Sequence, residues 1–169
     1  MADPSDELDY ENAPAEVQSM VEKAIIDWHP NLRHARIIVL MKNKVVKRSG
    51  REVLGQAQKV GKKWQAIASE PYDFLIWFSV TFWYDVSTHR QKVALVDHEL
   101  CHCKYDPDTY KASIRPHGIE EFPKVWHRHG DWLGEMENSG IAIKMHHDFT
   151  KDARGFVKRL DVGRGPDVD

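Results

Sequence analysis

The stretch that decides the fold is Val93-Ala-Leu-Val-Asp-His98-Glu99-Leu-Cys-His102-Cys103. It contains the pattern His-Glu-x-x-His, with two histidines four positions apart. Residues four apart on an α-helix lie on one face, so His98 and His102 can both reach one metal ion. Glu99 projects about 100° further round the helix, where it can meet a water molecule bound to that ion. The pattern therefore predicts a zinc-binding helix on which the Glu99 carboxylate accepts a proton from the bound water.

The neighbouring residues predict that this helix is buried. Thr88 has a side chain suited to the N-cap, and Asp106-Pro107-Asp108 is typical of a turn, so the helix is expected to end near Lys104 or Tyr105. The face opposite His98 is apolar: Val93, Val96, Leu100 and Cys103. The His98 face is partly apolar: Gln91, Ala94, Leu95 and His102. The alternative is a buried helix whose two histidines are satisfied by hydrogen bonds alone.

The composition is that of an ordinary globular protein. Of the 169 residues, 41% are hydrophobic and 30% are charged, and the net charge is −2. That charge argues against wholesale binding to nucleic acid or to an anionic membrane. No apolar run approaches the roughly 20 residues that span a bilayer, and the first residues do not resemble a secretory signal. Cys101 and Cys103 lie two apart and are not expected to form a disulfide. We therefore expect a cytoplasmic location, in the host cell if the protein is viral.

The pattern along the chain predicts one domain over residues 14–160. A disordered acidic tail precedes it at residues 1–13, and a flexible tail follows at residues 161–169. A helix should begin at Pro14 and end before His29-Pro30, with His29 at the surface. Strands are expected at 35–41, 53–60, 64–68 and 73–78, a helical turn capped by Ser79 at 79–85, and an extended segment at 109–115.

One part of the chain is strongly basic. Between Lys42 and Lys63, only Glu52 opposes eight cations: Lys42, Lys44, Lys47, Arg48, Arg51, Lys59, Lys62 and Lys63. Such a stretch can bind nucleic acid or an acidic partner. It can equally be the solvated edge of a sheet that lysines protect against aggregation, and we favour this second interpretation.

Zinc in a catalytic site needs a third protein ligand. The downstream candidates are His117, Glu120, Glu121, His127, His129, His146 and His147. His117 is preferred, because it follows an extended segment and starts a helix that Pro116 begins, Pro123 interrupts and Gly130 ends. Glu120 and Glu121 come next, while His127 and His129 are expected to be exposed.

Several motifs together resemble the phage metallopeptidase family. They are Asp73-Phe-Leu-Ile76, Phe82-Trp83, Leu95-Val-Asp-His-Glu-Leu-Cys-His102, Arg115-Pro-His117, Glu120-Glu-Phe122 and His129-Gly130, which lie between Val53 and Trp132. The family is similar in plan to minimal zincins such as the SprT-like proteases. The resemblance implies an α+β, zincin-like fold in which a small mixed sheet packs against the His-Glu-x-x-His helix. It also supports His117 as a ligand. Gly118 stands where the family typically has Asp, so a supporting role for that carboxylate is lost.

The combined expectation is a zinc metallopeptidase, encoded by a phage or prophage, that hydrolyses peptide bonds of a protein or peptide substrate. His98, His102 and His117 would hold Zn²⁺, and Glu99 would act as general base and acid on the metal-activated water. The alternative is a non-catalytic zincin-fold protein that binds zinc and acts on a host protein or nucleic-acid complex by contact. A closed site with Cys103 or Glu121 as a fourth ligand would favour that alternative.

Overall fold

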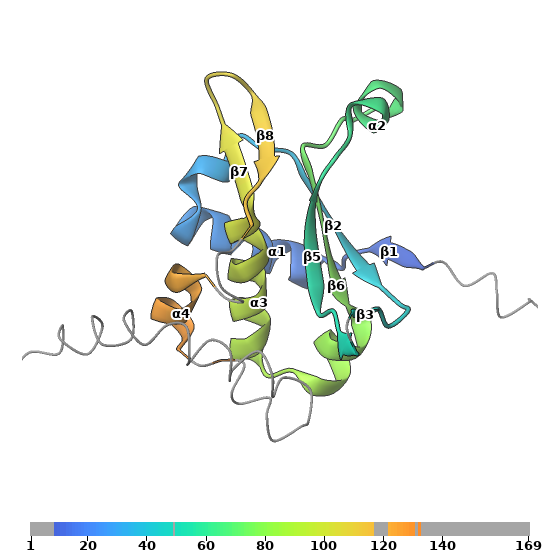
Figure 1. Ribbon diagram of the computed structural model, residues 1–169, viewed down its shortest axis with the longest axis vertical. Coiled ribbons are helices and arrows are strands. Elements are labelled where there is room, and N and C mark those ends of the chain that lie inside the picture. The colour runs from blue at the N-terminus through green and yellow to red at the C-terminus, as the bar shows by residue number, and fades with distance from the viewer. Residues whose placement is uncertain (1–8, 49, 117–121, 131, 133–169) are drawn as a thin grey trace, which may run out of the picture. The chain divides into compact units, whose positions relative to one another are not determined.

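A computed structural model describes residues 9–48, 50–116, 122–130 and 132 of the protein (Figure 1). The chain divides into two units, residues 1–116 and 117–169. The first unit mixes helices and strands and confirms the expected α+β class. In the second unit, the described residues form one helix, α4 (Pro123–His129). The single domain expected over residues 14–160 stays a prediction.

The described part of the first unit contains a four-stranded mixed sheet in the order β1-β2-β6-β5. β2 (Ile37–Lys42) and β6 (Phe74–Ser79) run parallel, and β5 (Gly55–Lys59) pairs antiparallel with β6 at the edge. β6 is flanked on both sides and is mostly buried, which explains its uninterrupted apolar sequence. The strands expected at 35–41, 53–60 and 73–78 are thereby confirmed with small shifts at their ends.

The fourth strand lies within the expected tail at residues 1–13, of which residues 1–8 lie outside the described residues. Tyr10–Asn12 form β1, which pairs antiparallel with β2. Two cations hold it there. Lys42 is buried with its Nζ 3.8 Å from the centre of the Tyr10 ring, and Lys44 Nζ lies 2.7 Å from Asp9 Oδ1. Backbone pairing and these contacts order a segment whose polar composition had indicated a mobile tail.

Two long helices pack beside the sheet (Figure 1). α1 (Ala15–Trp28) begins directly after Pro14, as expected, and a short 3₁₀ turn, η2 (Pro30–Leu32), follows it. The motif helix α3 (His89–His102) begins with a capping box. Thr88 Oγ1 accepts a hydrogen bond from Gln91 N at 3.3 Å, and Thr88 N donates to Gln91 Oε1 at 2.8 Å. The expected N-cap is confirmed.

The helical turn expected after β6 is a six-residue π-helix, η3 (Thr81–Val86). Ser79 Oγ accepts a hydrogen bond from Phe82 N at 3.3 Å, but the N-cap position is Val80 and not Ser79 as expected.

α3 ends earlier than expected, at His102 rather than near Lys104 or Tyr105. The chain passes directly into β7 (Cys103–Asp106), which pairs antiparallel with β8 (Lys111–Ile114). The Asp106 carboxylate builds the turn between them, because Oδ1 accepts from Asp108 N at 3.0 Å and Oδ2 accepts from Thr109 Oγ1 at 2.8 Å. The expected turn is therefore confirmed. The residues expected to form the last turn of the helix, up to Lys104 or Tyr105, instead pair as part of β7.

The strand expected at 64–68 is wrong, because these residues belong to a short helix, α2 (Lys62–Ile67). Its large apolar side chains stand three positions apart, which is a helical spacing, and they are exposed: Trp64 by 68% and Ile67 by 74%. The chain before it forms a small hairpin, β3 (Lys47–Arg48) with β4 (Arg51–Glu52), in which Gly50 has a φ of 78°. The basic stretch therefore covers several separate elements.

In the second unit, α4 begins at Pro123, so the expected interruption at this proline is the start of the described helix. Gly130 has a φ of 64° and ends the helix, as expected. His127 is exposed, but His129 is buried, contrary to expectation. In the described part of the chain, no helix has the length and apolar character to cross a membrane.

The capping box leads to a stability prediction. Thr88→Ala removes the hydroxyl that accepts from Gln91 N and should lower the free energy of unfolding by about 1 kcal/mol in a urea titration. Ser19→Ala removes an exposed hydroxyl inside α1 and should be neutral or slightly stabilising. Equal losses in the two variants would contradict the importance of the cap.

Candidate metal centre

Two imidazoles converge at the C-terminal end of α3. His98 Nε2 and His102 Nε2 lie 3.3 Å apart, and the rings meet edge to face. Two nitrogen ligands at about 2.0–2.1 Å from a tetrahedral zinc ion stand about 3.3 Å from each other. The spacing of the two nitrogens therefore fits ligands of one ion.

The tautomer of His102 is fixed by a backbone contact. His102 Nδ1 lies 2.7 Å from the carbonyl oxygen of Arg115, and a carbonyl can only accept a hydrogen bond. Nδ1 therefore carries the hydrogen, and Nε2 presents its lone pair towards His98. Arg115 N also donates to the carbonyl oxygen of His102 at 2.7 Å. The backbone of Arg115, the residue after β8, therefore forms two hydrogen bonds with His102. Support of this kind commonly orients metal-binding histidines.

Glu99 is buried beside the edge strand β5. A Cβ atom placed on Gly55 would lie 3.3 Å from Glu99 Oε1, 3.1 Å from Phe78 Cδ1 and 3.1 Å from the Trp77 carbonyl oxygen. The absence of a side chain at Gly55 thus lets the carboxylate approach the strand. Glu99 Oε1 therefore lies close to Gly55 of β5, and its expected role on a metal-bound water stays a prediction.

The other ligand candidates divide into two groups. His117, Glu120, Glu121, His146 and His147 lie outside the described residues, and so His117 stays a prediction as third ligand. Cys103, the suggested fourth ligand, is described. Its buried Sγ contacts the carbonyl oxygen of Glu99 at 3.7 Å, and burial, with the Glu99 charge second, raises the pKa of the thiol. In this structure the thiol is directed at the helix backbone, and a role for Cys103 as a fourth ligand stays a prediction.

A second cluster, on another face of α3, was missed by sequence reasoning. His29 was expected at the surface but is buried, and its Nε2 lies 2.7 Å from Asp97 Oδ1. Cys101 Sγ lies 3.9 Å from the same oxygen. Their donor atoms lie within 4.8 Å of one another, and all three residue types bind metals. The only available signal was that Asp97 and Cys101, like the motif histidines, stand four apart on the helix.

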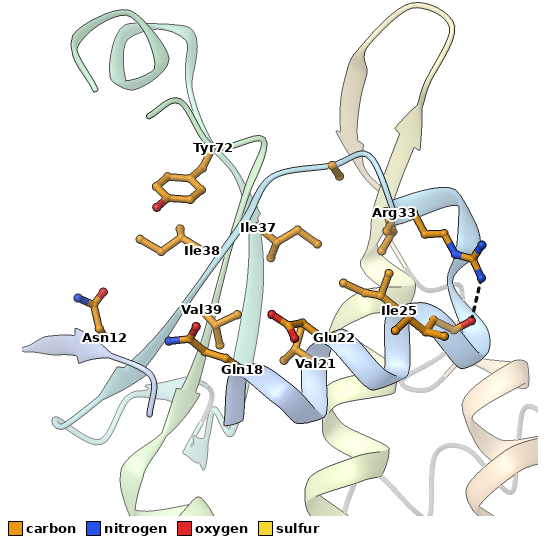
Figure 2. Close-up of a pocket in the computed structure, with 13 residues that line it drawn as sticks. Asn12, Gln18, Val21, Glu22, Ile25, Arg33, Ile37, Ile38, Val39 and Tyr72 are labelled. Carbon is orange, nitrogen blue, oxygen red and sulfur yellow. Dashed lines mark hydrogen bonds between the residues drawn. The ribbon is translucent and has the colours of Figure 1, made fainter. Parts of the chain in front are cut away.

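A pocket of about 500 Å³ lies apart from the motif, between α1 and β2 (Figure 2). Its apolar part includes Ile25, Ile37 and Val39, and Glu22 and Arg33 also line it. None of His98, Glu99 and His102 is among its lining residues. The pocket is therefore separate from the candidate metal centre.

A helix that brings two imidazoles and a buried glutamate beside a small mixed sheet is an arrangement suited to metal-dependent hydrolysis. The family model described as "Putative phage metallopeptidase" matches residues 8–150. The chain belongs to this family, which confirms the resemblance and extends it well beyond Val53–Trp132. Membership implies a peptidase that uses a metal. Among curated proteins and among solved structures, no match was found.

The contact at Gly55 can be tested by adding a methyl group. Gly55→Ala should lower the free energy of unfolding by about 1–3 kcal/mol, because the Trp77 carbonyl cannot move freely away. It should also displace the Glu99 carboxylate. Gly61→Ala is the matched control, since no atom lies within 4 Å of its added Cβ. Urea titration of both variants checks the prediction, which fails if Gly55→Ala is as stable as Gly61→Ala.

Proposed function

We propose that the protein is a zinc-dependent peptidase of the zincin-like type, in which His98 and His102 donate two of the nitrogen ligands. The observation that carries this proposal is the 3.3 Å separation of the two Nε2 atoms, with the His102 lone pair turned inwards by Arg115. His117 is the proposed third ligand. It stands two residues after Arg115, whose backbone already contacts His102.

Glu99 is the proposed general base and acid. When bound, zinc polarises the scissile carbonyl and lowers the pKa of a bound water to about 7. The Glu99 carboxylate would accept the proton of that water and pass it to the amine nitrogen that leaves. Burial of Glu99 beside β5 keeps competing water away from the carboxylate.

The proposed substrate is a peptide in extended conformation. β5 stands at the end of the sheet, so among the described residues one of its backbone edges lacks a strand partner. An extended peptide can add to such an edge through main-chain hydrogen bonds. Gly55 lies on β5 next to Glu99, and so a peptide bound there would pass close to the proposed catalytic carboxylate.

The non-catalytic alternative shares the metal centre but not the chemistry. A closed site with Cys103 or Glu121 as a fourth ligand would favour this alternative. The Cys103 thiol contacts the helix backbone, and Glu121 lies outside the described residues. An accessible metal position and peptide hydrolysis that depends on Glu99 would support the peptidase over this alternative.

Substitution of Glu99 gives the direct test. Glu99→Gln should bind zinc as the wild type does but lose hydrolysis of a quenched fluorescent peptide library by about 10²–10⁴-fold. Glu22→Gln, at an exposed position of α1, should keep full activity. His98→Ala should lose both zinc, measured by elemental analysis, and activity. Full activity of Glu99→Gln would remove Glu99 from the mechanism.

The same metal analysis tests the third ligand. Loss of zinc in His117→Ala but not in Glu120→Ala or Glu121→Ala supports His117. Zinc retained in His117→Ala would transfer that role to another residue.

A second candidate function is contact with single-stranded nucleic acid. The exposed Trp64 stands beside Lys62 and Lys63 on a helix that buries none of its residues. Aromatic side chains among lysines offer a stacking surface and a neutralising charge. Lys42 contacts the Tyr10 ring and Lys44 contacts Asp9. Lys47, Arg48 and Arg51 belong to the β3–β4 hairpin, a separate element. The proposed surface therefore consists of Lys59, Lys62, Lys63 and Trp64.

We expect a labelled single-stranded oligonucleotide to bind at low salt and to dissociate steeply as salt rises. Trp64→Ala and the double variant Lys62→Gln/Lys63→Gln should each weaken binding in fluorescence anisotropy. Lys23→Gln, an exposed lysine on α1, removes one charge elsewhere and should bind as the wild type does. Absence of binding at low salt would eliminate this function.

A further inference from the structure

The back of the metal-binding helix carries a buried carboxylate. Asp97 is 0% exposed, and His29 and Cys101 beside it are 7% and 6% exposed. Asp97 directly precedes His98, and Cys101 directly precedes His102. Thus α3 presents two pairs of residues with the same four-residue spacing, on different faces. A buried carboxylate is costly without a donor, and His29 supplies one.

The His29–Asp97 contact and the His98–His102 contact differ in length, and the lengths show that they differ in kind. His29 Nε2 lies 2.7 Å from Asp97 Oδ1, whereas His98 Nε2 lies 3.3 Å from His102 Nε2. Two ligands of one zinc ion stand about 3.3 Å apart, and a charge-assisted hydrogen bond measures about 2.7–2.9 Å. The contact between His29 and Asp97 is therefore a hydrogen bond. Cys101, at 3.9 Å from the same oxygen, adds a weak second donor.

His29 is held firmly by its own backbone. It caps the C-terminal end of α1, donating its N–H to the Ile25 carbonyl at 3.0 Å, and its carbonyl accepts from Leu32 N at 2.9 Å. The imidazole therefore projects from a fixed point between α1 and η2. Its hydrogen bond to Asp97 joins that point to α3 across 68 positions of sequence.

The orientation of α3 about its axis matters for metal binding. A helix with its side chains is about 10–12 Å across, so a rotation of about 10° moves a side-chain tip by about 1 Å. Ligand distances tolerate only about 0.2 Å. Both motif histidines would turn together, and their mutual spacing would survive. Their position relative to groups outside the helix, such as the Arg115 carbonyl oxygen 2.7 Å from His102 Nδ1, would not survive.

We propose that the His29–Asp97 hydrogen bond fixes the rotation of α3, and that both are positioning residues of the metal centre. The proposal rests on the proposed zinc site. Neither residue touches the ion. Loss of the hydrogen bond lowers zinc affinity because a turned α3 no longer keeps His102 Nδ1 at hydrogen-bond distance from the Arg115 carbonyl oxygen, which directs the lone pair of Nε2.

Two amide substitutions test the proposal. In His29→Gln, the side-chain nitrogen can occupy the place of Nε2 and donate to Asp97, whereas the shorter side chain of His29→Asn cannot reach it. We expect His29→Gln to keep most of the zinc affinity and His29→Asn to lose about 10–100-fold, measured by competition with a chelating indicator. His34→Ala, an exposed histidine nearby in sequence, is the control.

A second control separates positioning from general stability. Thr88→Ala destabilises the same helix from its other end, and urea titration ranks its stability against His29→Asn. The proposal requires that His29→Asn lose more zinc affinity than Thr88→Ala does for the same loss in free energy of unfolding. Equal zinc affinity in His29→Asn, His29→Gln and the wild type would overturn it. So would two zinc equivalents in the wild type, one of them lost in Cys101→Ser, because the cluster would then be a metal site. A wild type that binds no zinc would instead overturn the proposed function.

Discussion

The hydrogen bond between His102 Nδ1 and the Arg115 carbonyl oxygen, 2.7 Å long, is the contact on which the candidate site depends. It selects the tautomer that leaves the Nε2 lone pair facing His98. It also joins the last residue of α3 to the residue that follows the β7–β8 hairpin, so the orientation of His102 depends on that hairpin. The same connection brings the chain to Pro116 and then to His117. One backbone carbonyl thus orients one proposed ligand, and the other proposed ligand follows it by two positions in sequence.

Sequence reasoning succeeded where a local pattern has a single physical solution. The His-Glu-x-x-His spacing requires a helix, the Thr88–Gln91 pair forms the expected cap, and the apolar run 74–78 is a buried central strand. It failed where tertiary contacts decide. The end of α3 at His102 follows from pairing of β7 with β8, which no local pattern encodes. α2 was misassigned because its residues contact too little of the core for burial to show in their pattern.

His29 shows most clearly why part of the site was not predictable. A histidine before a proline at the end of a helix is usually a surface residue. Its partner, Asp97, is distant in sequence and lies within an apolar helix, where it could be taken for a solvated residue. Only the packing of α1 against α3 brings the two side chains together. The approach of His98 to His102 could be predicted because both members lie on one helix, and the His29–Asp97 contact could not because its members do not.

A buried hydrogen-bonded pair between two helices needs an explanation other than stability. Replacing a buried ion pair by well-packed apolar residues is often neutral or stabilising, so His29 and Asp97 add little that leucines could not supply. Apolar packing, however, tolerates small rotations of a helix at little cost, whereas a hydrogen bond weakens steeply away from its preferred distance and angle. The neighbours of Asp97 and Cys101 in sequence are the two histidines whose direction matters most. A polar contact at this place therefore specifies an angle, and the direction of both motif imidazoles depends on that angle.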